Sequence, residues 1–141
     1  MPDVNVWIAL VSDQHVHHLT AKQWAQKLEA DKLAFCRITE LGLLRLLTNH
    51  HVMGDSVLKP AQAWHIYDAL CADPRIIFLS EQHKFSAHWR ETGDLISGGP
   101  NAWTDAYLAA FASCERATVV TFDRQFKPLS GCTVFTLQPG L

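Results

Sequence analysis

The sequence has no long apolar run, no paired cysteines and no excess of charge of either sign. Its apolar stretches are too short and too interrupted to cross a bilayer, so no membrane-spanning segment is expected. No basic segment precedes an apolar stretch at the N-terminus, so no secretory signal is expected and the predicted compartment is the cytoplasm. The formal net charge of −2 gives no overall sign of nucleic-acid binding. Contacts with RNA or DNA would therefore need local basic side chains or a second subunit.

The cysteines and histidines do not form a metal motif. The four cysteines are widely separated and lack the C-x-x-C pairing of a zinc ribbon or a redox site. They are interpreted as reduced, buried cysteines that pack as small apolar side chains. Neighbouring histidines at residues 15–18 and 50–51 would point to different sides of a helix, which argues against a zinc site.

What the chain does contain is an alternation of strand-like and helix-like segments. At 141 residues, 48% of them hydrophobic, it can form one domain with a proper core. Strands are expected at residues 2–5, 33–37, 75–80, 117–122 and 132–137. Helices are expected at about 17–30, 40–50 (with Thr39 as its N-cap), 60–72, 81–93 and 103–117. This order predicts a single α/β domain over residues 1–141, a three-layer sandwich with a central, mostly parallel sheet.

Four acidic residues lie where such a fold forms its ligand site. Asp3 and Asp123 fall at strand ends. Glu40 and Asp105 fall in the first turns of helices. Sites in parallel sheets form beyond the carboxyl ends of the strands, so these carboxylates are expected to converge. Converging carboxylates repel one another and need protons or cations in compensation, which predicts a divalent metal.

Each acid, taken singly, also has an ordinary structural explanation. Asp3 suits a helix cap, and Asp123 suits a turn. Glu40 and Asp105 would interact favourably with the dipoles of their helices whatever the function. The order and the neighbours of the four acids therefore decide between the two interpretations.

Those neighbours carry a family resemblance. The relevant blocks are D-V-N-V-W-I-A-L, T-E-L-G-L-L-R-L-L, T-D-A-Y-L-A-A and T-F-D-R-Q-F. In this order they resemble PIN-domain ribonucleases, above all the VapC-like toxins of bacterial toxin–antitoxin pairs, and the likeness covers nearly the whole chain. The resemblance implies an endoribonuclease dependent on Mg²⁺ or Mn²⁺, in which a metal-activated water cleaves RNA phosphodiester bonds and leaves 5′-phosphate and 3′-hydroxyl ends.

The same resemblance assigns roles to the acids, which it implies are all catalytic. Asp3 and Asp105 are expected to bind the main metal directly, and carboxylate oxygens suit Mg²⁺ and Mn²⁺. Asp123 is expected to bind it through water or to hold a second metal. Glu40 is expected either to bind metal through water or to orient the attacking water.

Other residues are assigned supporting roles. Polar support is expected from Asn5, Thr104 and Thr121. Contacts with RNA phosphates are expected from Arg45, Arg124 and Lys127, with ion pairs or plain surface exposure as the alternative. The chain departs from the family pattern at its start, because only Met1 and Pro2 precede Asp3. Either the first strand is abbreviated or the natural start lies upstream.

The implied partners are an RNA substrate, a small antitoxin protein that covers the acids, and a second copy of the chain. A homodimer would pool the few basic residues of a near-neutral protein. One alternative is a catalytically weak PIN-like binding module whose acids dock a basic peptide, although docking does not require all four acids. Another is a receiver-like or phosphatase-like magnesium protein, but the chain lacks the D-x-D-x-[TV] motif or an equivalent aspartate pair.

Overall fold

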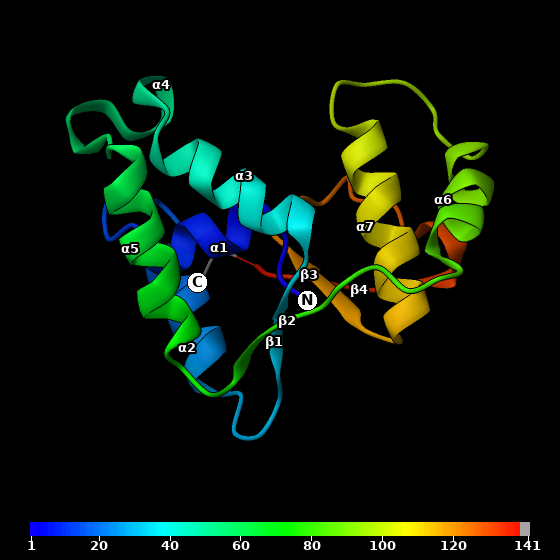
Figure 1. The fold of residues 1–141 in the computed structure, drawn as a ribbon, viewed down its shortest axis with the longest axis horizontal. Coiled ribbons are helices and arrows are strands. Elements are labelled where there is room, and N and C mark those ends of the chain that lie inside the picture. Colours follow the sequence, from blue (N-terminus) through cyan, green and yellow to red (C-terminus); the bar gives the residue numbers. More distant parts are fainter. Residues whose placement is uncertain (139–141) are drawn as a thin grey trace.

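A computed structural model describes residues 1–138 as an α/β fold (Figure 1). The helices are α1 (Val4–Val11), α2 (His18–Gln26), α3 (Arg37–Leu47), α4 (His50–Met53), α5 (Pro60–Cys71), α6 (Phe85–Gly93) and α7 (Ala102–Glu115). The strands are β1 (Leu33–Phe35), β2 (Ile76–Phe78), β3 (Thr118–Thr121) and β4 (Thr133–Thr136). The last three residues of the predicted 1–141 domain lie outside the described part. No helix in that part is long and apolar enough to cross a membrane.

The strands pair in parallel, as the alternation of strands and helices predicts. Strand β1 pairs with β2 and β3 pairs with β4, so the described residues form two short parallel ladders. The start of the chain lies along β3, where Pro2 forms a parallel bridge with Val120 and the Asp3 N–H donates to the Val120 carbonyl at 2.8 Å. The first strand is therefore reduced to this bridge, and the chain turns into α1 directly after it.

The N-terminal segment differs from the prediction of a strand over residues 2–5. Residues 4–11 form helix α1, because the Asp3 Oδ1 accepts the Val4 N–H at 2.6 Å and caps the first turn. The middle of α1 is buried from Val6 to Ala9, and the Trp7 ring stacks on Phe35 with centroids 3.7 Å apart. Burial on nearly all sides explains why the β-branched residues of this segment form a helix rather than a strand.

Helix α3 begins earlier than predicted. Thr39 is not its N-cap but lies inside the first turn and reaches back to Cys36. The Thr39 hydroxyl accepts the Cys36 N–H at 3.0 Å and donates to the Cys36 carbonyl at 3.0 Å. Helix α6 begins at Phe85 rather than at 81, and the short helix α4 is not predicted at all. The other predicted helices and strands are found within a few residues of their expected bounds, including α5, which starts at Pro60.

The core lies on both sides of the strands. On one side Trp7, Phe35 and Leu43 join α1, β1 and α3, and on the other Phe85 and Phe111 join α6 and α7. Helices α1 and α3 pack closely because position 42 of α3 is glycine: a Cβ there would lie 2.5 Å from Val4 Cγ2. This close packing fixes the start of α1, and with it Asp3, against the first turns of α3.

Candidate active site

Asp3 is held by side chains from two other positions. Its Oδ2 accepts hydrogen bonds from the Thr121 hydroxyl and from Asn5 Nδ2, both at 3.0 Å. The Asn5 amide also donates to Thr121 Oγ1 at 2.9 Å, and its Oδ1 accepts the Phe122 N–H at 3.1 Å. The predicted support residues Asn5 and Thr121 therefore contact Asp3 directly and fix α1 to the end of β3.

Asp123 follows β3 in a tight turn. Its Oδ1 accepts the Gln125 N–H at 2.7 Å, which holds the carboxylate in one orientation. The Asp123 N–H donates to Thr121 Oγ1 at 3.0 Å. One hydroxyl thus donates to the Asp3 carboxylate and accepts the N–H of Asp123, so Thr121 sets the relative positions of these two aspartates.

Asp105 projects from the first turn of α7, where its N–H donates to the Asn101 carbonyl at 2.9 Å. Burial, together with the negative charges of Asp3 and Asp123, raises the pKa of Asp105 to about 6. Burial also raises the pKa of Asp3, with a smaller contribution from Asp123 that opposes the hydrogen bonds from Thr121 and Val4. The three aspartates are therefore close enough to repel one another, whereas the sequence predicted that Glu40 would converge with them as a fourth acid.

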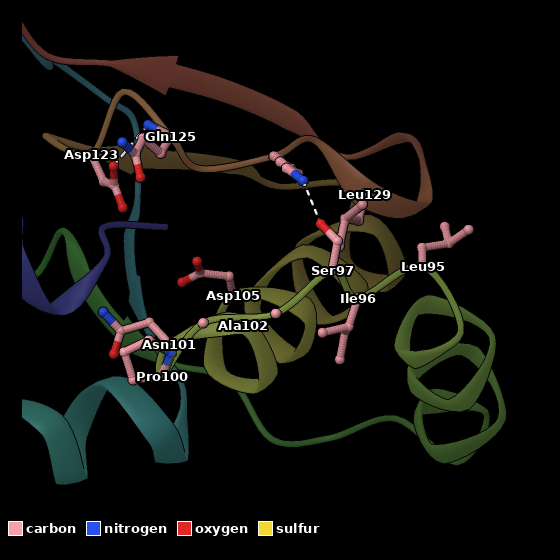
Figure 2. Close-up of a pocket in the computed structure, with 13 residues that line it drawn as sticks. Leu95, Ile96, Ser97, Pro100, Asn101, Ala102, Asp105, Asp123, Gln125 and Leu129 are labelled. Atoms are coloured by element: carbon pink, nitrogen blue, oxygen red, sulfur yellow. Dashed lines mark hydrogen bonds between the residues drawn. The ribbon is translucent and has the colours of Figure 1, made fainter.

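Two of these aspartates open into a cavity of about 300 Å³, which we call the acidic cavity (Figure 2). Its walls are residues 95–102, Asp105 and four side chains that follow β3: Asp123, Gln125, Lys127 and Leu129. In Figure 2 the carboxylates of Asp105 and Asp123 point into the same space. Sequence reasoning assigned no function to residues 97–101, S-G-G-P-N, a glycine-rich connection between α6 and α7. A loop of this kind between two helices is, however, a common place for functional residues.

Glu40 is placed differently from the three aspartates. It is 7% exposed, forms an ion pair with the guanidinium of Arg37, and contacts the Tyr67 hydroxyl. The pKa of Tyr67 is raised, first by burial and then by its neighbours Cys71 and Glu40. Glu40 does not line the acidic cavity. Neither Arg37 nor Tyr67 was predicted, because nothing in their local sequence points to a buried acid.

The remaining predicted residues, Thr104 and three basic side chains, differ in where they lie relative to the acidic cavity. Thr104 is half-buried in the first turn of α7, next to Asp105 in the chain, and its supporting role stays a prediction. Arg45 is exposed on α3. Arg124 donates to Gln138 Oε1 at 3.0 Å, outside the cavity walls. Lys127 alone of the three basic residues lines the acidic cavity, where its Nζ donates to Ser97 Oγ at 2.7 Å.

The donor set suits a hard divalent cation. Within residues 1–138, no group of three or more histidine, cysteine, aspartate or glutamate side chains is close enough to hold a metal by itself. Mg²⁺ commonly uses one or two carboxylates, with waters and substrate phosphates completing its shell. The pKa of Asp105 is raised first by burial and then by the negative charges of Asp3 and Asp123, and a cation would compensate those charges. The aspartates therefore fit the predicted metal as a partial shell rather than a closed cage.

A comparison with protein families decides the identity: the model of the PIN domain matches residues 1–131. The chain belongs to the PIN-domain family. This PIN domain is similar to Ribonuclease VapC41 of Mycobacterium tuberculosis, with 39% identity over 134 residues and 92% of both proteins covered. It is also similar to Ribonuclease VapC38 of the same organism, with 32% identity over 121 residues, 86% of this chain and 82% of that protein.

Solved structures show the same fold. One is VapBC-1 from nontypeable Haemophilus influenzae, with a TM-score of 0.68, 18% identity and 96% of both chains covered. Another is VapBC2 from Rickettsia felis bound to a DNA fragment from their promoter, with a TM-score of 0.66, 17% identity and 98% of both chains covered. The family match and the curated relatives confirm the predicted family and VapC-type ribonuclease function. The solved structures confirm the α/β fold class.

Proposed function

We propose that this PIN domain is a metal-dependent endoribonuclease, the toxin of a toxin–antitoxin pair, and that Asp3, Asp105 and Asp123 form its catalytic site. The observation that carries the proposal is the mutual repulsion of these three carboxylates, which contributes to a pKa of about 6 for Asp105. Three elements distant in the sequence supply the three acids. Such an arrangement costs stability in the folded protein, and it is explained if a cation binds there.

The residues would act as follows. Asp105 and Asp123, which share the acidic cavity, would hold the cation. Asp3, predicted from the sequence as a direct ligand, would add its charge from the place where Thr121 and Asn5 hold it. When bound, Mg²⁺ or Mn²⁺ supplies a water of lowered pKa and neutralises charge on the phosphate oxygens. At neutral pH Asp105, whose pKa is raised to about 6, is mostly ionised and its carboxylate is available as an acceptor. The predicted catalytic role of Glu40 stays a prediction.

The proposed partners follow from the relatives. The VapBC structures are named as two-protein assemblies, and we infer that a small antitoxin protein also binds this chain and covers its aspartates. An RNA substrate would place the protein in the cytoplasm. A homodimer remains part of the proposal, because the exposed basic residues Arg45 and Arg124 lie outside the acidic cavity of one copy.

The test is induced expression of wild type and Asp105→Asn, followed by mapping of newly formed 5′ ends across cellular RNA. Wild type should produce defined cuts with 5′-phosphate ends, and Asp105→Asn should produce none at the same protein level. Asp55→Asn, at an exposed acid in the turn Gly54–Ser56, is the matched control and should cut like wild type. A binding module that docks a basic peptide would give no cuts in any of the three strains, and that result would overturn the proposal.

A further inference from the structure

The acidic cavity has a basic end as well as an acidic one. Asp105 and Asp123 occupy one part of it, and Lys127 reaches across another part to Ser97 on the glycine-rich loop. In Figure 2 the dashed hydrogen bond at Ser97 lies toward Leu129, away from Asp123. A single cavity therefore presents carboxylates and an ammonium group at separate places, and both face the space that a substrate would enter.

The ammonium of Lys127 has no acidic partner among the described residues. Its hydrogen bond goes to a neutral hydroxyl, and it takes part in none of the ion pairs of residues 1–138. Lys32 provides a contrast. It also donates to a neutral oxygen, the Pro74 carbonyl at 2.9 Å, but it lies close enough to Asp73 to help lower the pKa of that carboxyl, which Arg75 lowers most. A lysine that lines a cavity and lacks a carboxylate partner is suited to bind an anion from solution.

The contact between Lys127 and Ser97 is also easily exchanged. Both side chains are exposed, so water competes for the hydrogen bond, and the long lysine chain loses rotamer freedom while it is held. A phosphate oxygen carries negative charge and would be a stronger acceptor than the serine hydroxyl. Ser97 itself is followed by Gly98 and Gly99, whose φ values of 53° and 103° favour glycine, so the turn that presents this hydroxyl is set by the sequence.

We propose that Lys127, with Ser97 as its resting partner, forms a second phosphate subsite that binds a phosphodiester next to the one at the aspartates. The inference rests on the proposed ribonuclease function and adds to it a second position at which the RNA backbone is held. A strand of RNA carries a charge at every nucleotide, and the aspartates repel all of them except where a cation intervenes. An ammonium in the same cavity would bind a neighbouring phosphate and thereby align the bond to be cleaved.

The experiment measures RNA binding as a function of salt. All proteins carry Asp105→Asn so that the RNA stays intact, and the probe is a short fluorescein-labelled oligouridylate followed by fluorescence anisotropy in Mg²⁺. The test variant is Lys127→Met, which keeps most of the length of the side chain and removes its charge. Lys32→Met is the matched control, and Ser97→Ala removes the resting partner while leaving the ammonium in place.

Lys127→Met should weaken binding by about tenfold, the effect of one charged contact in partly exposed surroundings. It should also reduce the slope of log Kd against log salt by about 0.7, the contribution of one phosphate contact on a single strand. Lys32→Met and Ser97→Ala should keep the parent slope. A purely structural latch between the two loops would instead make Ser97→Ala and Lys127→Met behave alike, with no change of slope, and that outcome would overturn the subsite.

The failure of the subsite is distinguishable from the failure of the proposed function. If the parent protein binds the probe, and wild type cuts cellular RNA, equal salt slopes for Lys127→Met and the parent refute the subsite alone. If no protein of the series binds the probe and wild type cuts no RNA, the ribonuclease proposal itself is refuted, and the subsite with it.

Discussion

Replacement of Asp105 by asparagine should stabilise the metal-free protein. Asparagine resembles the protonated carboxyl in shape and is neutral, so the variant shows what the folded protein loses by ionising Asp105. The pKa of this group is raised from 3.8 to about 6, first by burial and then by Asp3 and Asp123. The folded state therefore binds the proton more tightly than the unfolded state does, and ionisation of Asp105 destabilises the fold.

The magnitude follows from the size of the shift. A shift of about 2 units corresponds to roughly 3 kcal/mol at 1.36 kcal/mol per unit. About half of this is removed by solvent screening, because Asp105 is only half-buried, which leaves on the order of 1–1.5 kcal/mol. For a chain of this length, that free energy of unfolding corresponds to a rise in Tm of about 3–6 °C.

The assay is thermal unfolding, followed by circular dichroism, of wild type and Asp105→Asn in EDTA across a range of pH. Since the folded pKa is the higher one, the penalty is complete above about pH 6 and disappears as the pH falls toward 3.8. The difference in Tm between the two proteins should therefore be largest at pH 8 and small at pH 4. Both proteins also contain carboxyls such as Asp73, whose pKa is lowered by Arg75 and whose effect on stability has the opposite dependence on pH. These effects cancel in the difference between the two Tm values.

A divalent cation should reverse the order of stability. In Mg²⁺ or Mn²⁺ wild type should gain stability through binding and Asp105→Asn should gain less, because it lacks a ligand. The reasoning is refuted if Asp105→Asn unfolds at a lower temperature than wild type in EDTA at pH 8. It is also refuted if the difference in Tm does not depend on pH.

Two further predictions test the hydrogen bonds of Asp3 and the packing of α1 against α3. Asp3→Asn should not share the gain in Tm. In wild type the Asn5 amide and the Thr121 hydroxyl donate to the Asp3 carboxylate, and the NH₂ group of an asparagine would face these donors with donors of its own. A gain equal to that of Asp105→Asn in the same melts would show that these hydrogen bonds contribute little. Gly42→Ala should lower the free energy of unfolding in urea by about 1–3 kcal/mol, because the new Cβ would lie 2.5 Å from Val4 Cγ2. Val4→Ala should restore part of that loss, and an unchanged midpoint for Gly42→Ala alone would show that α1 and α3 separate freely.

The sequence predicts those parts of the molecule that depend on local patterns. The alternation of strands and helices, the start of α5 at Pro60 and the first-turn position of Asp105 all follow from periodicity and capping preferences. It fails for α1, where burial from Val6 to Ala9 overrides the strand preference of β-branched residues. It also misplaces the cap of α3, because Thr39 caps backwards to Cys36 from within the helix.

The site shows the same division. The order of the acids and their neighbours in the sequence predict four converging carboxylates. The structure brings Asp3, Asp105 and Asp123 close enough to repel one another, whereas Glu40 lies outside the acidic cavity. The partners of Glu40 were missed for different reasons. Arg37 was assigned to the preceding strand because the helix was predicted to begin at residue 40, whereas Tyr67 comes from α5, which lies beside α3 only in the folded chain. The contact between Lys127 and Ser97 joins loops 30 residues apart and is equally invisible to local patterns.

Cleavage of RNA by the purified protein during metal titration tests most directly whether the three aspartates form a metal-dependent nuclease site. EDTA-treated wild type should leave RNA intact, and Mg²⁺ or Mn²⁺ should restore cleavage that yields 5′-phosphate ends. Asp105→Asn should remain inactive at every metal concentration while staying folded. Cleavage by wild type in EDTA, or wild-type activity of Asp105→Asn, would contradict the assignment of the site.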